Sequence, residues 1–185
     1  MTTRDALLTH AEDLARRTGY DGFSFADLAT GAGIRKASVH HHFPTKPALA
    51  AELMEAYAAR TLGALEPVAQ ASGATRLGAV LDLYREALQG GRSQCLCVAF
   101  SAVQERLPAK VQDAVAAFQA EMRGFLEAAF AAGAKDGTLQ TAATPEAEAA
   151  ATFALLEGAQ LVARASRDAT QFDLAIAPLR ARLTP

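Results

Sequence analysis

The hydrophobic pattern at the start of the chain predicts two helices. Apolar residues recur every three or four positions over residues 7–15, which is the spacing of one face of an α-helix. Gly19 follows, and glycine readily takes the left-handed conformation that ends a helix. Ser24 can cap a second helix over residues 25–32, because its hydroxyl can accept a bond from a first-turn N–H. Gly33 then supplies a second left-handed stop.

A short third helix and a longer fourth helix follow in the same pattern. We expect the third over about residues 35–43, where Pro44 breaks it. Thr45 can cap the fourth helix, which is expected over about residues 46–71, with Pro67 as a kink or an early end.

Turn residues divide the rest of the chain into five more helices. Apolar side chains keep the helical spacing, and glycine, proline and capping hydroxyls mark the ends. We expect these helices over about residues 77–88, 93–106, 108–133, 145–167 and 172–183, with a loop over residues 134–143.

The composition supports an all-α fold. The 185 residues are 51% hydrophobic and include 45 alanines, against 8 valines and 2 isoleucines. Alanine favours helix strongly, and so few β-branched residues leave little material for a large sheet.

The sequence predicts a cytoplasmic protein rather than a secreted or membrane one. Cys95 and Cys97 are its two cysteines, and such close neighbours on one helix make a poor disulfide. Charges run through the first seventeen residues, unlike a signal peptide. No uninterrupted apolar run reaches the length of a membrane span.

The formal net charge of −2 hides a local excess of cations. All four histidines lie in the first fifty residues, and no acid occurs between Asp27 and Glu52. Arg35, Lys36 and a histidine triplet fall in that interval. The electrostatic field around these residues therefore favours binding of phosphate groups. The third predicted helix also follows a short helix and a glycine turn, which is the position of the recognition helix in a helix-turn-helix unit.

Residues 7–54, LLTHAEDLARRTGYDGFSFADLATGAGIRKASVHHHFPTKPALAAELM, resemble the amino-terminal domain of the TetR family of transcriptional regulators. The anchors of this resemblance are Gly19-Tyr20, Ser24, Leu28-Ala29, Ala32-Gly33, His42-Phe43, Lys46 and Leu49. The resemblance implies a homodimeric DNA-binding regulator, usually a repressor, that a small molecule releases from a near-palindromic operator. It also implies a DNA-binding domain over residues 1–47 and a helical effector-binding and dimerisation domain over residues 48–185.

The family resemblance also assigns roles to residues. Lys46 matches a lysine that contacts a DNA phosphate, and Lys36 and Ser38 occupy recognition-helix positions. Two positions depart from the family pattern: Arg35 replaces a capping serine, and His40 replaces a tyrosine. The predicted DNA-binding residues are Ser24, Arg35, Lys36, Ser38, His40, His41 and Lys46.

A metal site at the histidine triplet is the weaker interpretation. Neighbouring residues on a helix point about 100° apart, so three in a row do not share one ion easily. His42 is expected to pack beneath the helix, and His40 and His41 could also be merely solvated. We expect no metal and no cofactor.

The effector region is less constrained than the DNA-binding region. Cys95 is expected near the start of a helix, where a thiol can become reactive towards oxidants or electrophiles, as in some TetR-like regulators; a buried structural cysteine is the alternative. Aromatic and sulfur residues could equally be ordinary core. The predicted effector-binding or sensing residues are Cys95, Phe100, Gln104, Phe118, Met122 and Phe125.

Dimerisation is assigned to the last two predicted helices. Residues 150–163 and 172–183 present broad faces of small and apolar residues, which could pair across a two-fold axis as a four-helix bundle. The two recognition helices would then lie about one DNA turn apart.

Two rival functions remain at this point. An enzyme has little support, because the sequence lacks a glycine-rich phosphate loop, a nucleophile elbow and metal-ligand spacing. A DNA-binding protein without a small-molecule effector is the second rival.

Overall fold

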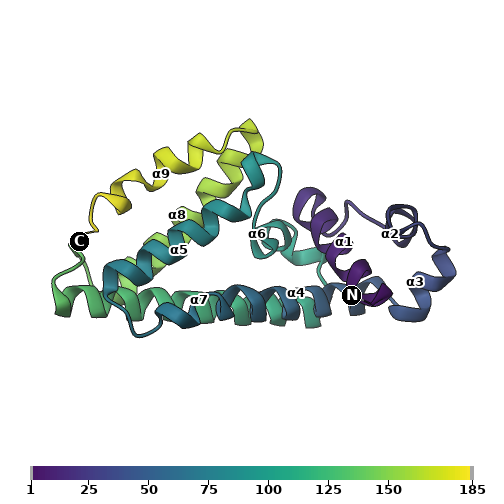
Figure 1. Ribbon diagram of the computed structural model, residues 1–185, viewed down its shortest axis with the longest axis horizontal. Coiled ribbons are helices and arrows are strands. Elements are labelled where there is room, and N and C mark those ends of the chain that lie inside the picture. Colours follow the sequence, from purple (N-terminus) through teal and green to yellow (C-terminus); the bar gives the residue numbers. More distant parts are fainter. Residues whose placement is uncertain (1, 184–185) are drawn as a thin grey trace. The chain divides into compact units, whose positions relative to one another are not determined.

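The structure is a computed structural model that describes residues 2–183 (Figure 1). Within these residues it contains helices and one isolated β-bridge, between Leu139 and Leu183, so the all-α prediction is confirmed. No helix in this range is long and apolar enough to cross a membrane. The α-helices are α1 (Thr3–Thr18), α2 (Phe25–Ala32), α3 (Lys36–His42), α4 (Lys46–Gly63), α5 (Gly73–Ala87), α6 (Leu96–Ser101), α7 (Ala109–Asp136), α8 (Pro145–Ser166) and α9 (Thr170–Arg180). Three 3-10 turns are η1 (Glu66–Val68), η2 (Gln89–Gly91) and η3 (Gln104–Arg106).

The predicted stops and caps at the start of the chain are confirmed. Gly19 ends α1 with φ 78°, and Gly33 ends α2 in the left-handed region with φ 65°. Ser24 caps α2 in a reciprocal arrangement with Asp27, which satisfies two backbone donors at the helix start. These local interactions explain why α2 occupies the predicted residues.

The sixth predicted helix is shorter in the structure than in the sequence analysis. It was expected over residues 93–106, but α6 is only Leu96–Ser101, followed by the separate turn η3. The backbone N–H of Ser93 donates to the Leu88 carbonyl, and that of Cys95 donates to the side chain of Gln160. These bonds hold Ser93 in the turn that follows α5 and attach Cys95 to α8, and the helix begins at the next residue, Leu96.

The ends of α4 and α7 also differ from the simplest expectation. Helix α4 ends at Gly63, well before residue 71, so the early end predicted near Pro67 is what occurs. Helix α7 continues past Gly133 to Asp136. A side chain at position 133 would collide with Leu139, because a Cβ there would lie 2.5 Å from the Leu139 side chain. The glycine with a left-handed backbone is Gly137, which directly follows α7 and has φ 77°.

The chain divides into two compact units. The first comprises residues 1–59 and 96–117, and the second comprises residues 60–95 and 118–185, of which the structure describes all but the terminal residues. In the first unit α2 packs on both α1 and α3, and the side chains of Leu7, Leu28 and Val39 are buried.

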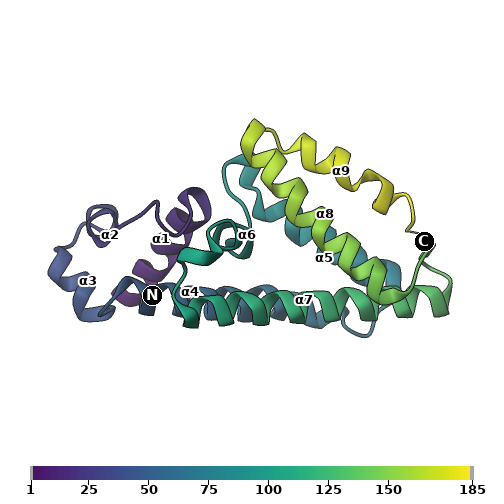
Figure 2. The ribbon, with the colours of Figure 1, turned by 180° about the vertical axis from the view of Figure 1, so that it is seen from behind.

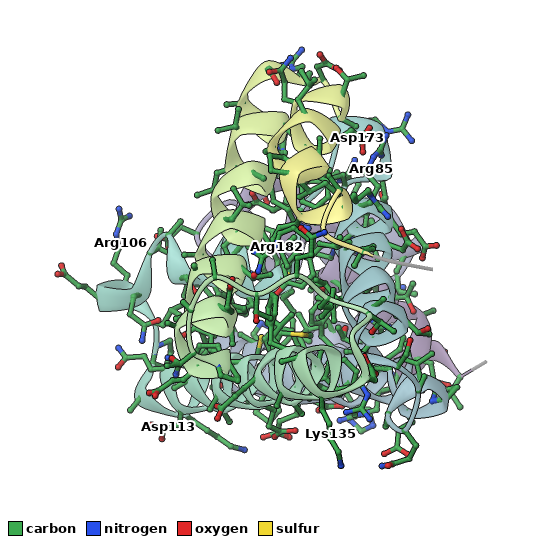
Figure 3. All side chains as sticks on the ribbon, turned by 90° about the vertical axis from the view of Figure 1, so that its left-hand side faces the viewer. Arg85, Arg106, Asp113, Lys135, Asp173 and Arg182 are labelled. Carbon is green, nitrogen blue, oxygen red and sulfur yellow. The ribbon has the colours of Figure 1, made fainter. Side chains whose placement is uncertain are left out.

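In the second unit α8 and α9 pack side by side, as Figures 1 and 2 show from opposite sides. Arg85 on α5 bonds Asp173 on α9 at 2.5 Å, and the two side chains lie together in Figure 3. Apolar side chains of α5, α7, α8 and α9 that are at most 1% exposed fill the core; they include Leu77, Val80, Met122, Leu126, Phe130, Leu156, Phe172 and Ile176.

Candidate nucleic-acid interface

Helices α2 and α3 form two short consecutive helices joined by the Gly33 turn (Figure 1). Val39 is the buried residue of α3. Lys36, Ser38, His40 and His41 are all exposed, so the predicted contact residues share the accessible surface of the helix. The arrangement presents a short polar and cationic helix to solvent.

The cations at the start of α3 are available to an external anion. Arg35 and Lys36 are exposed and form no ion pair with any residue in the described range 2–183. The predicted loss of the cap is confirmed: Arg35 is the N-cap residue of α3 and makes no side-chain capping bond. Uncapped N–H groups and two cations together favour a phosphate at this point.

The three histidines of α3 do not play the same part. The His40 ring makes an edge contact with the Phe25 ring, with centroids 4.8 Å apart. His42 is half-buried and lies 5.5 Å from His41, ring to ring. In residues 2–183 no three histidine, cysteine, aspartate or glutamate side chains converge as a metal site.

Ser24 is exposed, but its hydroxyl is engaged by the start of α2. It donates to the Asp27 carboxylate at 2.7 Å and accepts from the Asp27 N–H at 3.4 Å. The side-chain and backbone bonds from Ser24 hold the pKa of Asp27 below its usual value. Ser24 therefore fixes the first turn of α2, and a contact with DNA would be additional to that role.

Lys46 has a different environment from the cations of α3. It is half-buried at the first residue of α4, and its Nζ donates to the carbonyl of Phe23 at 2.5 Å. The same nitrogen lies 4.8 Å from the Tyr20 ring centroid and 4.5 Å from that of Phe23. Burial lowers the pKa of Lys46, and the carboxylates of Asp21 and Asp27 oppose that shift.

The aromatic partners of Lys46 were not identified as functional residues from the sequence. Tyr20 was noted only as part of a helix stop, and Phe23 was not singled out. The lysine is 23 positions from Phe23, so no local periodicity connects them. The signal that was present is two aromatic residues, Tyr20 and Phe23, in the short segment between the Gly19 stop and the capping Ser24.

The predicted effector residues fall in different surroundings. Phe118 and Met122 are buried in the second unit, whereas Phe100 is buried in the first unit against Tyr20, ring centroids 5.9 Å apart. Gln104 is exposed on η3. Phe125 is half-buried and lines a groove of about 500 Å³ in the second unit, together with Leu62, Leu65, Glu66, Ala69, Gln70 and Glu121.

The cysteines are both buried. Cys95 is 2% exposed and directly precedes the six-residue helix α6. Its backbone N–H donates to Oε1 of Gln160 at 2.7 Å, and Nε2 of Gln160 donates to the Tyr84 carbonyl, also at 2.7 Å. Gln160 thus connects α8 to both α5 and the segment before α6, within the second unit.

Comparison with known protein families gives two matches. Residues 7–53 match the family described as bacterial regulatory proteins, tetR family. Residues 73–179, more than half of the chain, match the family described as tetracyclin repressor-like, C-terminal domain. The first match covers the helices of the candidate interface.

Solved structures show the same fold along the whole chain. A TetR-family transcriptional regulator from Agrobacterium tumefaciens is 30% identical, with a TM-score of 0.91 over 99% of this chain and 98% of that one. The reduced form of Escherichia coli NemR is 26% identical, with a TM-score of 0.79 over 98% and 97%. A TetR transcriptional regulator from Legionella pneumophila, 22% identical, shares the fold with a TM-score of 0.88 over 100% and 98%.

A curated relative matches over a short stretch of the chain. The HTH-type transcriptional regulator CymR of Pseudomonas putida is 41% identical over 46 residues, which are 25% of this chain and 23% of CymR. The exposed α3 cations, the two family matches and the full-length structural likeness agree, and the chain belongs to the TetR family of DNA-binding transcriptional regulators.

Proposed function

We propose that this regulator is a homodimeric repressor that holds a near-palindromic DNA operator until an effector releases it. The observation that carries the DNA contact is the accessible face of α3, where Arg35, Lys36, Ser38, His40 and His41 are exposed with no acid nearby in sequence. Cations at a helix start position the protein on phosphates, and the polar side chains behind them can reach base edges. Residues 1–47 carry DNA binding and residues 48–185 carry the effector and dimer functions.

The dimer is supported by an apolar face on α8 and α9. Leu155, Leu161, Val162 and Leu174 are 36%, 46%, 56% and 68% exposed. Along α8 the exposed or half-exposed apolar positions repeat every three or four residues: Ala151, Ala154, Leu155, Gly158, Leu161, Val162 and Ala165. A continuous exposed apolar stripe is costly in water, and a second copy of α8 and α9 across a two-fold axis covers it as a four-helix bundle.

The effector is proposed to act on the second unit. Phe125 and Leu62 give the 500 Å³ groove an apolar wall, and the carboxylates of Glu66 and Glu121 form no ion pair within residues 2–183. Such a groove suits a ligand with an apolar body and a positive charge better than an anion.

A thiol-reactive effector at Cys95 is the second candidate. It is favoured by the bond from the Cys95 amide to Gln160, which links the cysteine segment to α5 and α8, and by the likeness to NemR, whose structure was solved in a reduced form. Because the thiol is 2% exposed, a reagent could reach it only when the segment opens locally.

Selection of bound fragments from sheared genomic DNA tests the DNA-binding function. The wild type should enrich a near-palindrome. On a recovered fragment Lys36→Ala should weaken binding and reduce the salt slope by about one. Lys135 on α7 is also exposed (Figure 3), and Lys135→Ala should change neither. A failure to enrich any fragment would contradict the proposal. The enzyme alternative is disfavoured because the relatives are described as regulators.

A second arm of the same experiment tests the effector. Loss of the enriched site after treatment with a thiol-reactive electrophile, with retention in Cys95→Ser, supports the thiol route. Thermal stabilisation by amphipathic cations, abolished in Phe125→Ala, supports the groove. If neither treatment has an effect, the regulator without an effector is favoured.

A further inference from the structure

Two of the proposed DNA contacts on α3 have a charge that depends on pH. Arg35 and Lys36 are cations throughout the physiological range of pH, whereas an imidazole ordinarily gains its proton near about pH 6.5. His40 and His41 lie in the last turn of α3, and both are exposed. The two rings can therefore meet DNA either as neutral hydrogen-bonding groups or as cations.

Packing holds the two rings in different directions. The His40 ring makes an edge contact with the Phe25 ring of α2, with centroids 4.8 Å apart, and the His41 ring lies 5.5 Å from that of the half-buried His42. Consecutive residues of a helix point about 100° apart. His40 and His41 therefore do not share one phosphate easily, and each meets its own part of the DNA backbone.

The acids of the helices around α3 are engaged by other partners. Helix α2, which packs on α3, has Asp27 as its one charged residue, and Ser24 bonds that carboxylate. Glu52 on α4 pairs with Arg4 on α1, and Arg4 also lies over the Phe43 ring that follows the histidines. Within residues 2–183 no carboxylate forms an ion pair with a histidine.

Bound DNA supplies the negative charge that these rings lack in the free protein. Residues three or four apart share a face of a helix, so Lys36 lies on the same face as His40, and Ser38 on the same face as His41. A DNA backbone that contacts Lys36 and Ser38 therefore brings phosphates close to both rings. A nearby negative charge favours the protonated form of an imidazole, and the carbonyl end of a helix favours a cation as well.

We infer that His40 and His41 bind operator DNA as imidazolium ions, so that each copy of the chain takes up protons from solvent when it binds. Each protonated ring donates an N–H to a phosphate oxygen. The inference rests on the proposed DNA-binding function and adds a regulation to it: because the protonated form binds more tightly, operator affinity rises as the pH falls from 8 to 6. Neutral rings that contact base edges would take up no proton.

The first test measures affinity against pH at fixed ionic strength, on a duplex recovered by selection. Wild-type affinity should fall at least about tenfold from pH 6 to pH 8. His40→Gln and His41→Gln keep a polar side chain that gains no proton, so each should remove part of this fall and the double variant most of it. His10→Gln is the control, because His10 is half-buried on α1 against Gly31 of α2, and it should keep the whole fall. An undiminished fall in the double variant would overturn the inference.

The second test separates charge from hydrogen bonding by measuring salt dependence at two pH values. A cation that binds a phosphate releases counterions, so the slope of log affinity against log salt should be steeper at pH 6 than at pH 8, by about one for each protonated histidine. Lys36→Met should reduce the slope equally at both pH values. The double histidine variant should show the same slope at both. A wild-type slope that does not change with pH would show that the rings bind in the neutral form, and would overturn the inference.

The third readout is the nuclear magnetic resonance spectrum of the imidazole rings. At pH 7.5 the ring C–H signals of His40 and His41 should move towards the positions of a protonated ring when the duplex is added, and those of His10 should stay in place. Signals that stay at the neutral positions while other α3 signals move would overturn the inference. If the wild type enriches no fragment between pH 6 and pH 8, the proposed function itself fails. Enrichment with an affinity that does not depend on pH overturns the proton uptake alone.

Discussion

Glu148 is the most buried carboxylate whose partners the structure defines. Its side chain is 8% exposed and bonds Arg182 at 2.6 Å. The same oxygen accepts from the backbone N–H groups of Ala142 and Ala143. The bond from Arg182 is the main cause that holds the pKa of Glu148 below its usual value, and burial acts against it. This one carboxylate connects Arg182, two residues past the end of α9, with the loop after α7 and the start of α8.

Replacing Arg182 by alanine should therefore destabilise the second unit. We expect Arg182→Ala to lower the free energy of unfolding at pH 7 by about 2 kcal/mol, because a buried charge loses a charge-assisted bond. Arg180→Ala is the control two residues away: Arg180 pairs with Asp82 with both side chains well exposed, so its loss should cost under about 1 kcal/mol. Urea unfolding of both variants measures the difference, and equal losses would contradict the argument.

The same pair gives a pH dependence with a definite sign. A carboxylate with a lowered pKa in the folded state stabilises above its ordinary pKa of about 4.5, and this stability is lost as the pH falls through the lower folded value. The stability difference between the wild type and Arg182→Ala should therefore be full at pH 7 and shrink below about pH 4. A difference that grows on acidification would show that another group dominates.

At the scale of single helices, local signals determined the boundaries wherever the ends are capped locally. Ser24 and Gly33 define α2, and Thr144 with Pro145 defines the start of α8, as the sequence predicted. Helix α6 differs because the segment before it is held by a distant side chain, that of Gln160, 65 positions from Cys95. No pattern near residue 95 contains that partner, so the sequence could not predict the shorter helix.

The close contact between α5 and α7 also depends on residues that are far apart in the sequence, and it gives a testable prediction. A Cβ on Gly73 would lie 2.2 Å from the backbone nitrogen of Gly133 and 2.6 Å from the carbonyl oxygen of Ala129. Backbone cannot rotate away, so Gly73→Ala should destabilise by about 1–3 kcal/mol. At Gly78, on the same helix, the nearest atom lies 4.0 Å away, on Leu183. Gly78→Ala should stabilise by up to about 1 kcal/mol, and chemical denaturation of both variants tests the opposite signs.

At the scale of the whole molecule, the sequence predicted the exposed residues of the candidate interface. It did not predict the buried contacts that hold the Lys46 ammonium in place. Lys36, Ser38 and His41 were predicted as contacts from the family resemblance, and their side chains are exposed. The direction of the Lys46 ammonium depends on Tyr20 and Phe23 from another part of the first unit. Packing between segments decides such orientations, and a single sequence does not contain them.

The proposed dimer makes the largest-scale prediction, because DNA affinity then depends on a surface far along the chain from α3. Leu161 and Val162 are about half exposed, so Leu161→Glu should leave the folded monomer intact while placing a charge in an apolar interface. Burying an unpaired carboxylate is strongly unfavourable, and the variant should sediment as a monomer. Losing the second half-site contact should lower operator affinity by about a hundredfold or more.

The matched control for this variant is Ala131→Glu, which adds the same charge at an exposed position on α7 and should remain dimeric with wild-type affinity. Circular dichroism and thermal unfolding of both variants show whether the helices persist. If Leu161→Glu stays dimeric, the α8 stripe is not the interface. If it becomes monomeric yet binds the operator as the wild type does, one copy of α3 is enough for binding. That result would contradict the proposal that a dimer binds a near-palindromic operator. The combination of an intact helical monomer with weak binding is expected only when two copies read the two half-sites together.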